Sequence, residues 1–261
     1  MGLPVDKLVI ATNENDILDR FFKTGRYEKH PTYGAAAEGG LVSDGVKAHE
    51  DGVKETLSPA MDILVSSNFE RLLWFLAYEF ASSAGMDDEW NKKQAGQEVS
   101  SWFADLKTKG GFGPVYKDVL EAARRTFESE RVSDDQTLAT IQSLYREVGY
   151  VLDPHTAVGV EAARRSAKRA AEGRVQGEDG EEQIGQPSEV PIISLSTAHP
   201  AKFAGAVELA LKEEEGFEFE KKVLPAEFVG LDKKEKRVRE VENDWRAVRE
   251  VVRGEVEGEG R

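Results

Sequence analysis

The sequence contains no cysteine. A chain without cysteine has no disulfide framework, no thiolate metal site and no cysteine nucleophile. Basic residues are also in deficit, because 35 Lys and Arg stand against 49 Asp and Glu, which gives a formal net charge of -14. Nucleic acids and anionic membranes attract basic surfaces, so we expect neither as a partner. No apolar run approaches the roughly 20 residues that cross a bilayer, and no targeting pattern is visible. We therefore predict a cytoplasmic protein.

Two stretches combine a short apolar run, a polar turn and a helix. Residues 7–12 (KLVIAT) predict a buried strand, and the polar cluster at 13–16 (NEND) precedes an apolar helix face. Residues 192–195 (IISL) predict a second strand, after which Pro200 begins a helix with an apolar residue at every fourth position. Ser196 and Thr197 therefore lie where a strand meets a helix, which is where ligands bind in open α/β sheets.

The rest of the chain is mainly helical. Apolar spacing predicts helices at 69–81, 90–106, 115–130, from Ser133 onward and at 160–171, so helices outnumber strands in an α/β protein. The Gly-rich run 110–113 predicts a turn rather than a phosphate-binding loop, because Pro114 removes an amide donor.

Three further segments are distinguished by composition. Residues 29–55 and 172–190 lose helical periodicity and predict two mobile insertions. Residues 213–261 are strongly charged and predict a C-terminal extension. A group of basic residues predicts a solvated helix face, and its members are Arg164, Arg165, Lys168 and Arg169.

Four stretches together resemble threonine synthase of the fungal and bacterial type. They are LPVDKLVIATNENDIL with FFKTGRYE, LSPAMDILVSSNFERLL, GYVLDPHTAVGVEAA and STAHPAKFAGAVE. The resemblance spans nearly the whole chain apart from the two insertions. It implies the C-terminal part of a three-layer domain of the pyridoxal-phosphate-dependent fold type II, similar to the tryptophan synthase β chain. It also implies a lyase that converts O-phospho-L-homoserine and water to L-threonine and phosphate, with pyridoxal 5'-phosphate as electron sink.

The resemblance also implies site residues. In the family, the Thr of the STAHPAKF motif lies against the pyridine nitrogen of the cofactor, and the matching residue here is Thr197, with Ser196 as the adjacent candidate. Residues from two loops are further candidates for lining the active site, namely Asn13, Asn15, Asp16, His155 and Thr156. Each has a structural alternative, which is helix capping for Thr197 and the 13–16 loop and a satisfied turn for His155.

The family's catalytic lysine is not among these residues. Its Schiff-base lysine and its glycine-rich phosphate loop both precede the region that matches residue 1, and neither motif is present. Lys202 begins a helix and is predicted to be exposed, while His199 is expected to support the Thr197 turn. We therefore expect residues 1–212 to form the C-terminal portion of the catalytic domain, with no catalytic residue and no metal site, and to be inactive alone.

The state of assembly is open between two possibilities, and two alternative functions also remain open. The enzyme acts either as a monomer on its small-molecule substrate or together with the N-terminal half of the same enzyme. The first alternative is a non-catalytic fragment or pseudoenzyme that interacts with another protein through unpaired strands. The second is an acidic helical interaction protein with no link to pyridoxal phosphate.

Overall fold

The computed structural model describes residues 5–29, 52–173, 191–236 and 238–259. Its contacts divide the chain into two compact units, Met1–Val223 and Leu224–Arg261. In the first unit the elements are β1 (Leu8–Thr12), α1 (Ile17–Thr24), β2 (Tyr27–Glu28), η1 (Pro59–Met61), α2 (Phe69–Ser82), α3 (Asp88–Lys109), β3 (Gly111–Phe112), α4 (Lys117–Thr126), β4 (Phe127–Arg131), α5 (Asp134–Val148), α6 (Pro154–Gly173), η2 (Pro200–Phe203), α7 (Ala204–Leu211) and α8 (Phe219–Lys222). The helix-rich α/β prediction is confirmed, and the domain limit at 212 stays a prediction.

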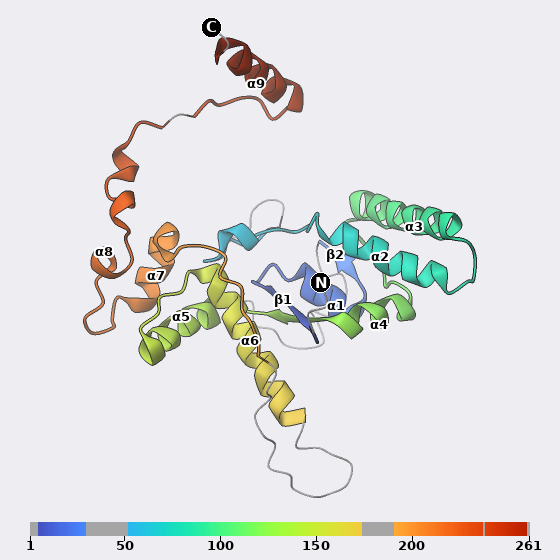
Figure 1. Cartoon of the computed structure of the whole chain (residues 1–261), viewed down its shortest axis with the longest axis horizontal. Helices are drawn as coiled ribbons and strands as arrows, with labels where there is room; N and C mark the ends of the chain where they lie inside the picture. The colour runs from blue at the N-terminus through green and yellow to red at the C-terminus, as the bar shows by residue number, and fades with distance from the viewer. Residues whose placement is uncertain (1–4, 30–51, 174–190, 237, 260–261) are drawn as a thin grey trace, which may run out of the picture. The chain divides into compact units, whose positions relative to one another are not determined.

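A short parallel sheet separates two layers of helices in the first unit. β1 pairs with β4 in a register that runs from Leu8↔Phe127 to Thr12↔Arg131. Successive residues of a strand face opposite sides. Ser129 donates its hydroxyl to Asp19 of α1 at 2.9 Å, whereas the neighbouring Glu130 pairs with Arg165 of α6 at 3.4 Å. Because these neighbours reach different helices, α1 and α6 cover opposite faces of the sheet (Figure 1).

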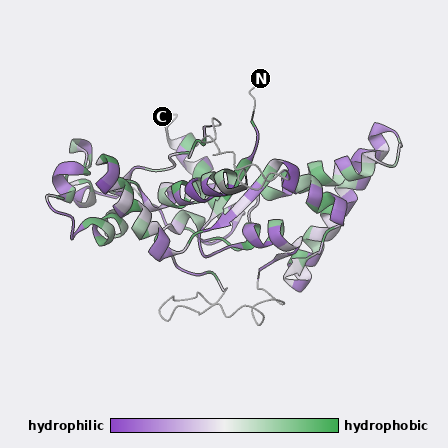
Figure 2. Cartoon of the chain, turned by 90° about the horizontal axis from the view of Figure 1, so that it is seen from below, coloured by the Kyte–Doolittle hydropathy of each residue, from purple (hydrophilic) through white to green (hydrophobic). Residues whose placement is uncertain are grey.

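Aromatic side chains fill the larger core, which lies between α1, α2, α3 and α4. Phe21 of α1 is completely buried, and its ring meets that of Phe69 at 4.9 Å and that of Tyr27 at 6.3 Å, both near perpendicular. Edge-to-face pairs of this kind add about 0.5–1.5 kcal/mol each beyond the area they bury. The helices carry hydrophobic and hydrophilic residues together, as packing on one face requires (Figure 2).

Two predicted elements differ from the structure, and one of them concerns a strand that was missed and the other a strand that does not form. The predicted helix at 115–130 ends at Thr126, and the chain then continues as β4. The local pattern favours a helix there, but pairing with β1 outweighs it. Residues 192–195 form no strand with the part of the chain that the structure describes. Ile193 is 79% exposed and Leu195 is 76% exposed, so their apolar side chains lie on an open face.

The basic group on α6 is only partly a solvated face, because Lys168 and Arg169 are exposed while Arg164 and Arg165 are half-buried. Arg165 and Arg169 both form ion pairs with Glu130, and Arg169 also pairs with Glu128, so their charges are matched by carboxylates on the α6 side of β4. The sequence did not predict these ion pairs because the partners lie in another element. Of the two predicted insertions, residues 30–51 and 174–190 lie outside the described residues.

The second unit contains η3 (Ala226–Phe228), η4 (Leu231–Lys233) and α9 (Trp245–Glu259). Apolar side chains on α9 are exposed, with Trp245 at 62% and Val252 at 55%. Among the described residues of both units, no helix is long and apolar enough to span a membrane.

The aromatic core gives a stability prediction. Replacing Phe21 by Ala removes a fully buried ring, and such substitutions cost about 3–5 kcal/mol. The matched control is Phe75→Ala, because Phe75 is 63% exposed, and we expect it to cost about 1 kcal/mol or less. Equilibrium denaturation of both variants measures the difference. Equal losses would contradict the location of the core.

Candidate functional site

The buried carboxylate of Asp153 organises the turn that precedes α6. Asp153 is 1% exposed, and its Oδ1 accepts hydrogen bonds from the backbone N–H of His155 at 2.9 Å and from the His155 ring Nδ1 at 3.0 Å. Its Oδ2 accepts the hydroxyl of Thr156. Pro154 has no N–H to satisfy, so this Asp-Pro pair is suited to begin a helix. His155 and Thr156 therefore lie in the first turn of α6, and not in a loop before a helix at 160.

His155 connects α6 to the η1 turn. Its Nε2 accepts the backbone N–H of Ala60 at 3.1 Å, so the ring proton is on Nδ1, which faces Asp153. The ring also packs against that of Phe203, with centroids 4.4 Å apart. Because both ring nitrogens have protein partners, His155 holds the site together and has no nitrogen left to bind a ligand.

Thr156 and Thr197 meet although they lie far apart in the sequence. The Thr156 Oγ1 accepts the backbone N–H of Thr197 at 3.0 Å, and the two threonine Oγ1 atoms are 3.4 Å apart. A hydroxyl carries one proton, and Thr156 gives that proton to Asp153. The 3.4 Å contact is long for an O–H···O bond. The exposed Thr197 hydroxyl is therefore able to donate its proton to another group.

Capping does not explain Thr197. The N-cap of η2 is His199, whose Nδ1 accepts the backbone N–H of Ala201 at 3.2 Å. A cavity of about 520 Å³ lies beside this turn, and its walls include Ser196, His199 and Lys222. Thr197 lies between Ser196 and Ala198 in the sequence, and both of these residues line the cavity. The structure thus places the Thr197 hydroxyl next to a cavity whose walls carry both polar and apolar groups.

The asparagines of the 13–16 loop are fully engaged in the protein. Asn13 is 1% exposed, and its side-chain amide donates to Asp62 at 2.8 Å and to the Ser58 hydroxyl at 3.1 Å. Its Oδ1 accepts the backbone N–H of Asn15 at 2.9 Å. The Asn15 amide bridges to the carbonyl of Lys54 at 2.9 Å. These residues clasp the segment around η1, and neither is a helix cap.

Asp16 occupies the N-cap position of α1 but its side chain makes no capping bond. Its carboxylate pairs instead with Arg20 at 2.9 Å and with Arg131 at 3.7 Å. The capping explanation is therefore wrong for Asp16. The structure brings Asn13 and Asn15 to η1, and η1 to His155, whereas Asp16 pairs with Arg20 of α1 and with Arg131 at the end of β4.

Asp134, a half-buried carboxylate at the start of α5, supports the segment that leads into η1. Asp134 accepts the backbone N–H of Leu57 at 3.1 Å. Burial raises the pKa of Asp134, with the nearby charges of Glu14, Asp62 and Asp135 adding to the rise, while the Leu57 hydrogen bond opposes it. Asp134, Glu14, Asp62 and Asp135 therefore repel one another, and this repulsion destabilises the ionised form of Asp134 in the folded chain.

Sequence reasoning missed several residues of this network. An Asp-Pro pair before an apolar helix is a recognisable start signal, so Asp153 could have been found. Asp62 and Ser58 carry no such signal, because their partner Asn13 lies more than forty residues away and their own segment shows no periodicity.

Neither Lys202 nor the Gly-rich run at 110–113 has the surroundings of a cofactor site. Lys202 is exposed, as predicted. Gly111 pairs with Glu28 in the antiparallel β2–β3 ladder, where an added Cβ would lie 2.7 Å from the Glu28 Cγ. The run at 110–113 is therefore a packed turn. Nor does any group of three or more His, Asp or Glu in the described part of the chain form a metal site.

Comparisons with known proteins give one consistent family. A family model described as "Threonine synthase, C-terminal" matches residues 178–252. Threonine synthase from Saccharomyces cerevisiae is 44% identical over 263 residues, which is 99% of this chain and 42% of that protein. Threonine synthase from Schizosaccharomyces pombe is 46% identical over 231 residues, or 88% of this chain and 39% of that protein. The chain thus spans about two-fifths of the length of the relatives it matches.

Solved structures agree with the sequence matches. The crystal structure of threonine synthase from yeast superposes with a TM-score of 0.69 at 43% identity, covering 99% of this chain and 43% of that chain. The structure of threonine synthase from Brucella melitensis, described as bound to PLP, superposes with a TM-score of 0.63 at 34% identity, covering 97% of this chain and 41% of that chain.

The Asp134 cluster gives a pH prediction. Because its pKa is raised in the folded chain, Asp134 favours folding most below its unfolded pKa of about 4. That contribution is lost as the pH rises through the raised folded value. Asp134→Asn cannot ionise, so we expect its stability relative to the wild type to increase as the pH rises from about 4 toward 7. Thermal denaturation across this range measures the difference.

The control for this prediction is Asp135→Asn, which removes an exposed charge at the neighbouring position. It should keep most of the Asp134 slope, since Asp135 is only a minor contributor to the Asp134 pKa. A pH-independent difference between the wild type and Asp134→Asn would exclude the raised pKa.

Proposed function

This chain belongs to the threonine synthase family, and we propose that it forms the part of the catalytic domain that holds the ring edge of pyridoxal 5'-phosphate. In this proposal the reaction converts O-phospho-L-homoserine and water to L-threonine and phosphate. One observation carries the assignment to this site, which is the exposed Thr197 hydroxyl whose neighbour Thr156 has already given its proton to Asp153.

The residues present suit one edge of the cofactor. A pyridine nitrogen is a hydrogen-bond acceptor, and Thr197 has a donor to offer beside a cavity that Ser196 and His199 help to line. A neutral hydroxyl binds that nitrogen without forcing its protonation, which an Asp partner would do. Ser196, which lines the cavity, is the adjacent candidate for the same contact. When bound, the cofactor supplies an electron sink for carbanions.

The other residues of the site act by positioning. Asp153 orients the Thr156 hydroxyl, and Thr156 in turn holds the backbone of Thr197 at 3.0 Å. His155 and Asn13 fix the η1 segment against α6 and β1. These contacts hold the Thr197 backbone in one place before ligands arrive, which lowers the entropic cost of binding.

We infer that the Schiff-base lysine and the phosphate-binding loop come from the part of the family that this chain does not match. The described residues support an assembly of that kind. The backbone from residue 192 to 196 has no hydrogen-bond partner among them, and Ile193 and Leu195 are exposed beside it. β1 pairs on one edge only within the described chain. Unpaired strand edges of this type accept further strands.

A non-catalytic role rests on the same open edges. A fragment or pseudoenzyme would use them to bind another protein rather than to complete an active site. A cytoplasmic location, and the choice between a monomer and a two-part enzyme, stay predictions of the sequence.

The proposal predicts a two-part requirement for activity. We expect no phosphate release from O-phospho-L-homoserine by this chain with added pyridoxal phosphate. Activity should appear when the chain is co-expressed with the N-terminal part of the Saccharomyces cerevisiae relative that it does not match. In that assembly, Thr197→Val should lower kcat roughly 10- to 100-fold, because one hydrogen bond to a polar ring atom is lost. Phosphate release assays measure both effects.

Thr197→Ser is the matched control, because it keeps the hydroxyl, and we expect its kcat to stay within about threefold of the wild type. Turnover by the isolated chain would overturn the two-part assignment. A co-expressed assembly that forms but releases no phosphate would favour the non-catalytic role. Equal activity of the Val and Ser variants would remove Thr197 from the site.

A further inference from the structure

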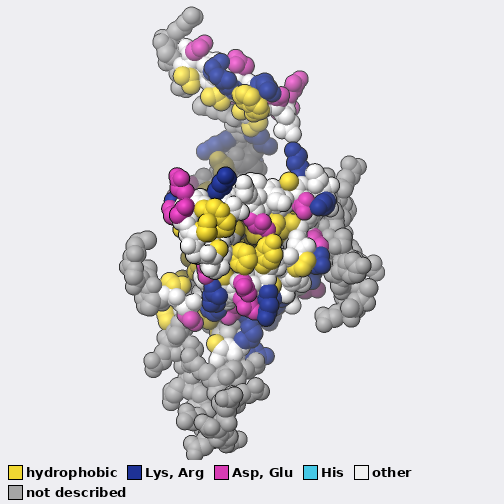
Figure 3. Space-filling view, turned by 90° about the vertical axis from the view of Figure 1, so that its right-hand side faces the viewer, with side chains coloured by type: hydrophobic (Ala, Val, Ile, Leu, Met, Phe, Trp, Pro, Cys, Tyr) yellow, Lys and Arg dark blue, Asp and Glu magenta, His cyan; other side chains and the backbone are white. Residues whose placement is uncertain are grey.

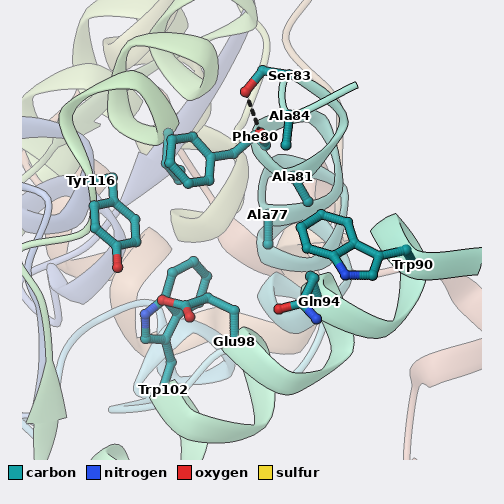
Figure 4. A pocket seen from close by; sticks show the side chains of 11 residues that line it. Ala77, Phe80, Ala81, Ser83, Ala84, Trp90, Gln94, Glu98, Trp102 and Tyr116 are labelled. Atoms are coloured by element: carbon teal, nitrogen blue, oxygen red, sulfur yellow. Dashed lines mark hydrogen bonds between the residues drawn. The ribbon is translucent and has the colours of Figure 1, made fainter. Parts of the chain in front are cut away.

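A second cavity lies between α2, α3 and α4, on residues that the proposed active site does not use. Its volume is about 260 Å³, which is just below the usual range of roughly 300–1,000 Å³ for ligand sites. Figure 4 shows its lining from close by. A cavity of this size suits a small molecule rather than a macromolecular surface.

The sequence explains why space is left there. Residues four apart share one face of a helix, and α3 presents Trp90, Gln94, Glu98 and Trp102 in such a row. The facing helix α2 contributes mainly small side chains, among them Ala77. Large residues opposite small ones normally interdigitate. Here they enclose a cavity that opens to the surface.

Aromatic rings dominate the walls. Phe80 and Tyr116 stack with centroids 5.1 Å apart and planes 8° from parallel, and they are 38% and 57% exposed. Trp90 lies across the cavity from this pair in Figure 4, and Trp102 also lines the cavity. The face of an aromatic ring carries a partial negative charge and attracts cations. Hydrophobic side chains gather on this face of the molecule, with charged ones around them (Figure 3).

Glu98 adds a full negative charge to this aromatic wall. It is half-buried, and no described residue forms an ion pair or hydrogen bond with it. Two other acidic residues of α3 are paired, since Asp88 binds Lys92 and Asp105 binds Lys109. A carboxylate against aromatic surface gains most from a cation that brings its own apolar groups.

We propose that this cavity binds a small organic ammonium ion. The Glu98 carboxylate neutralises its charge, and the rings of Trp90, Trp102, Phe80 and Tyr116 contact its alkyl groups. This site is independent of the proposed function, because none of its residues belongs to the Thr197 network.

The test compares two probes of equal shape on the purified chain. Choline carries a quaternary ammonium, and 3,3-dimethylbutan-1-ol is its neutral isostere. Titration calorimetry, with tryptophan fluorescence as the second readout, should show choline binding with a Kd in the millimolar range or tighter, roughly tenfold or more below that of the neutral alcohol. Equal affinities for the two probes, or no binding of choline, would overturn the proposal.

Variants locate the site. Glu98→Gln should weaken choline binding roughly tenfold while leaving the alcohol unchanged. Glu89→Gln removes the same charge from an exposed position of α3 and should bind choline as the wild type does. Trp90→Leu is an independent second variant that tests the site even if Glu98→Gln does not fold. It should also weaken choline binding. Wild-type affinity in both Glu98→Gln and Trp90→Leu would place any binding elsewhere and refute this site.

Discussion

The interaction on which the candidate site depends is the set of hydrogen bonds to the buried Asp153 carboxylate. It accepts donors from the backbone and ring of His155 and from the hydroxyl of Thr156. A buried carboxylate without such donors would cost several kcal/mol. Through these bonds Asp153 begins α6, fixes the His155 ring toward Ala60 and directs the Thr156 lone pairs toward Thr197. One side chain thus connects three segments that are distant in the sequence.

Local signals predicted the parts of the fold that depend on neighbouring residues. The apolar run at 7–12 became β1, and the Pro200 start with its four-residue spacing became η2 and α7, where Val207 and Leu211 are fully buried. Ser133 forms a complete capping box with Gln136 at the start of α5. The expectation that Thr197 and the first turn of α6 share one site followed from the family resemblance and not from spacing.

Long-range contacts decided what local signals missed. The segment 127–131 reads as a continuation of α4, but its register with β1 makes it a strand. Arg165 and Arg169 read as solvated until β4 supplies Glu130 as their partner. Residues 192–195 have strand composition without a partner among the described residues. Their exposed apolar side chains are consistent with an edge that another strand covers.

Amide hydrogen exchange in the Asp153→Ala variant tests the central role of this carboxylate most directly. The amides of Ala60 and Thr197 are held by His155 and Thr156. The account predicts that both lose protection together, by roughly tenfold or more, while the Leu57 amide, held by Asp134, exchanges as in the wild type. Unchanged protection at Ala60 and Thr197, or an equal loss at Leu57, would contradict it.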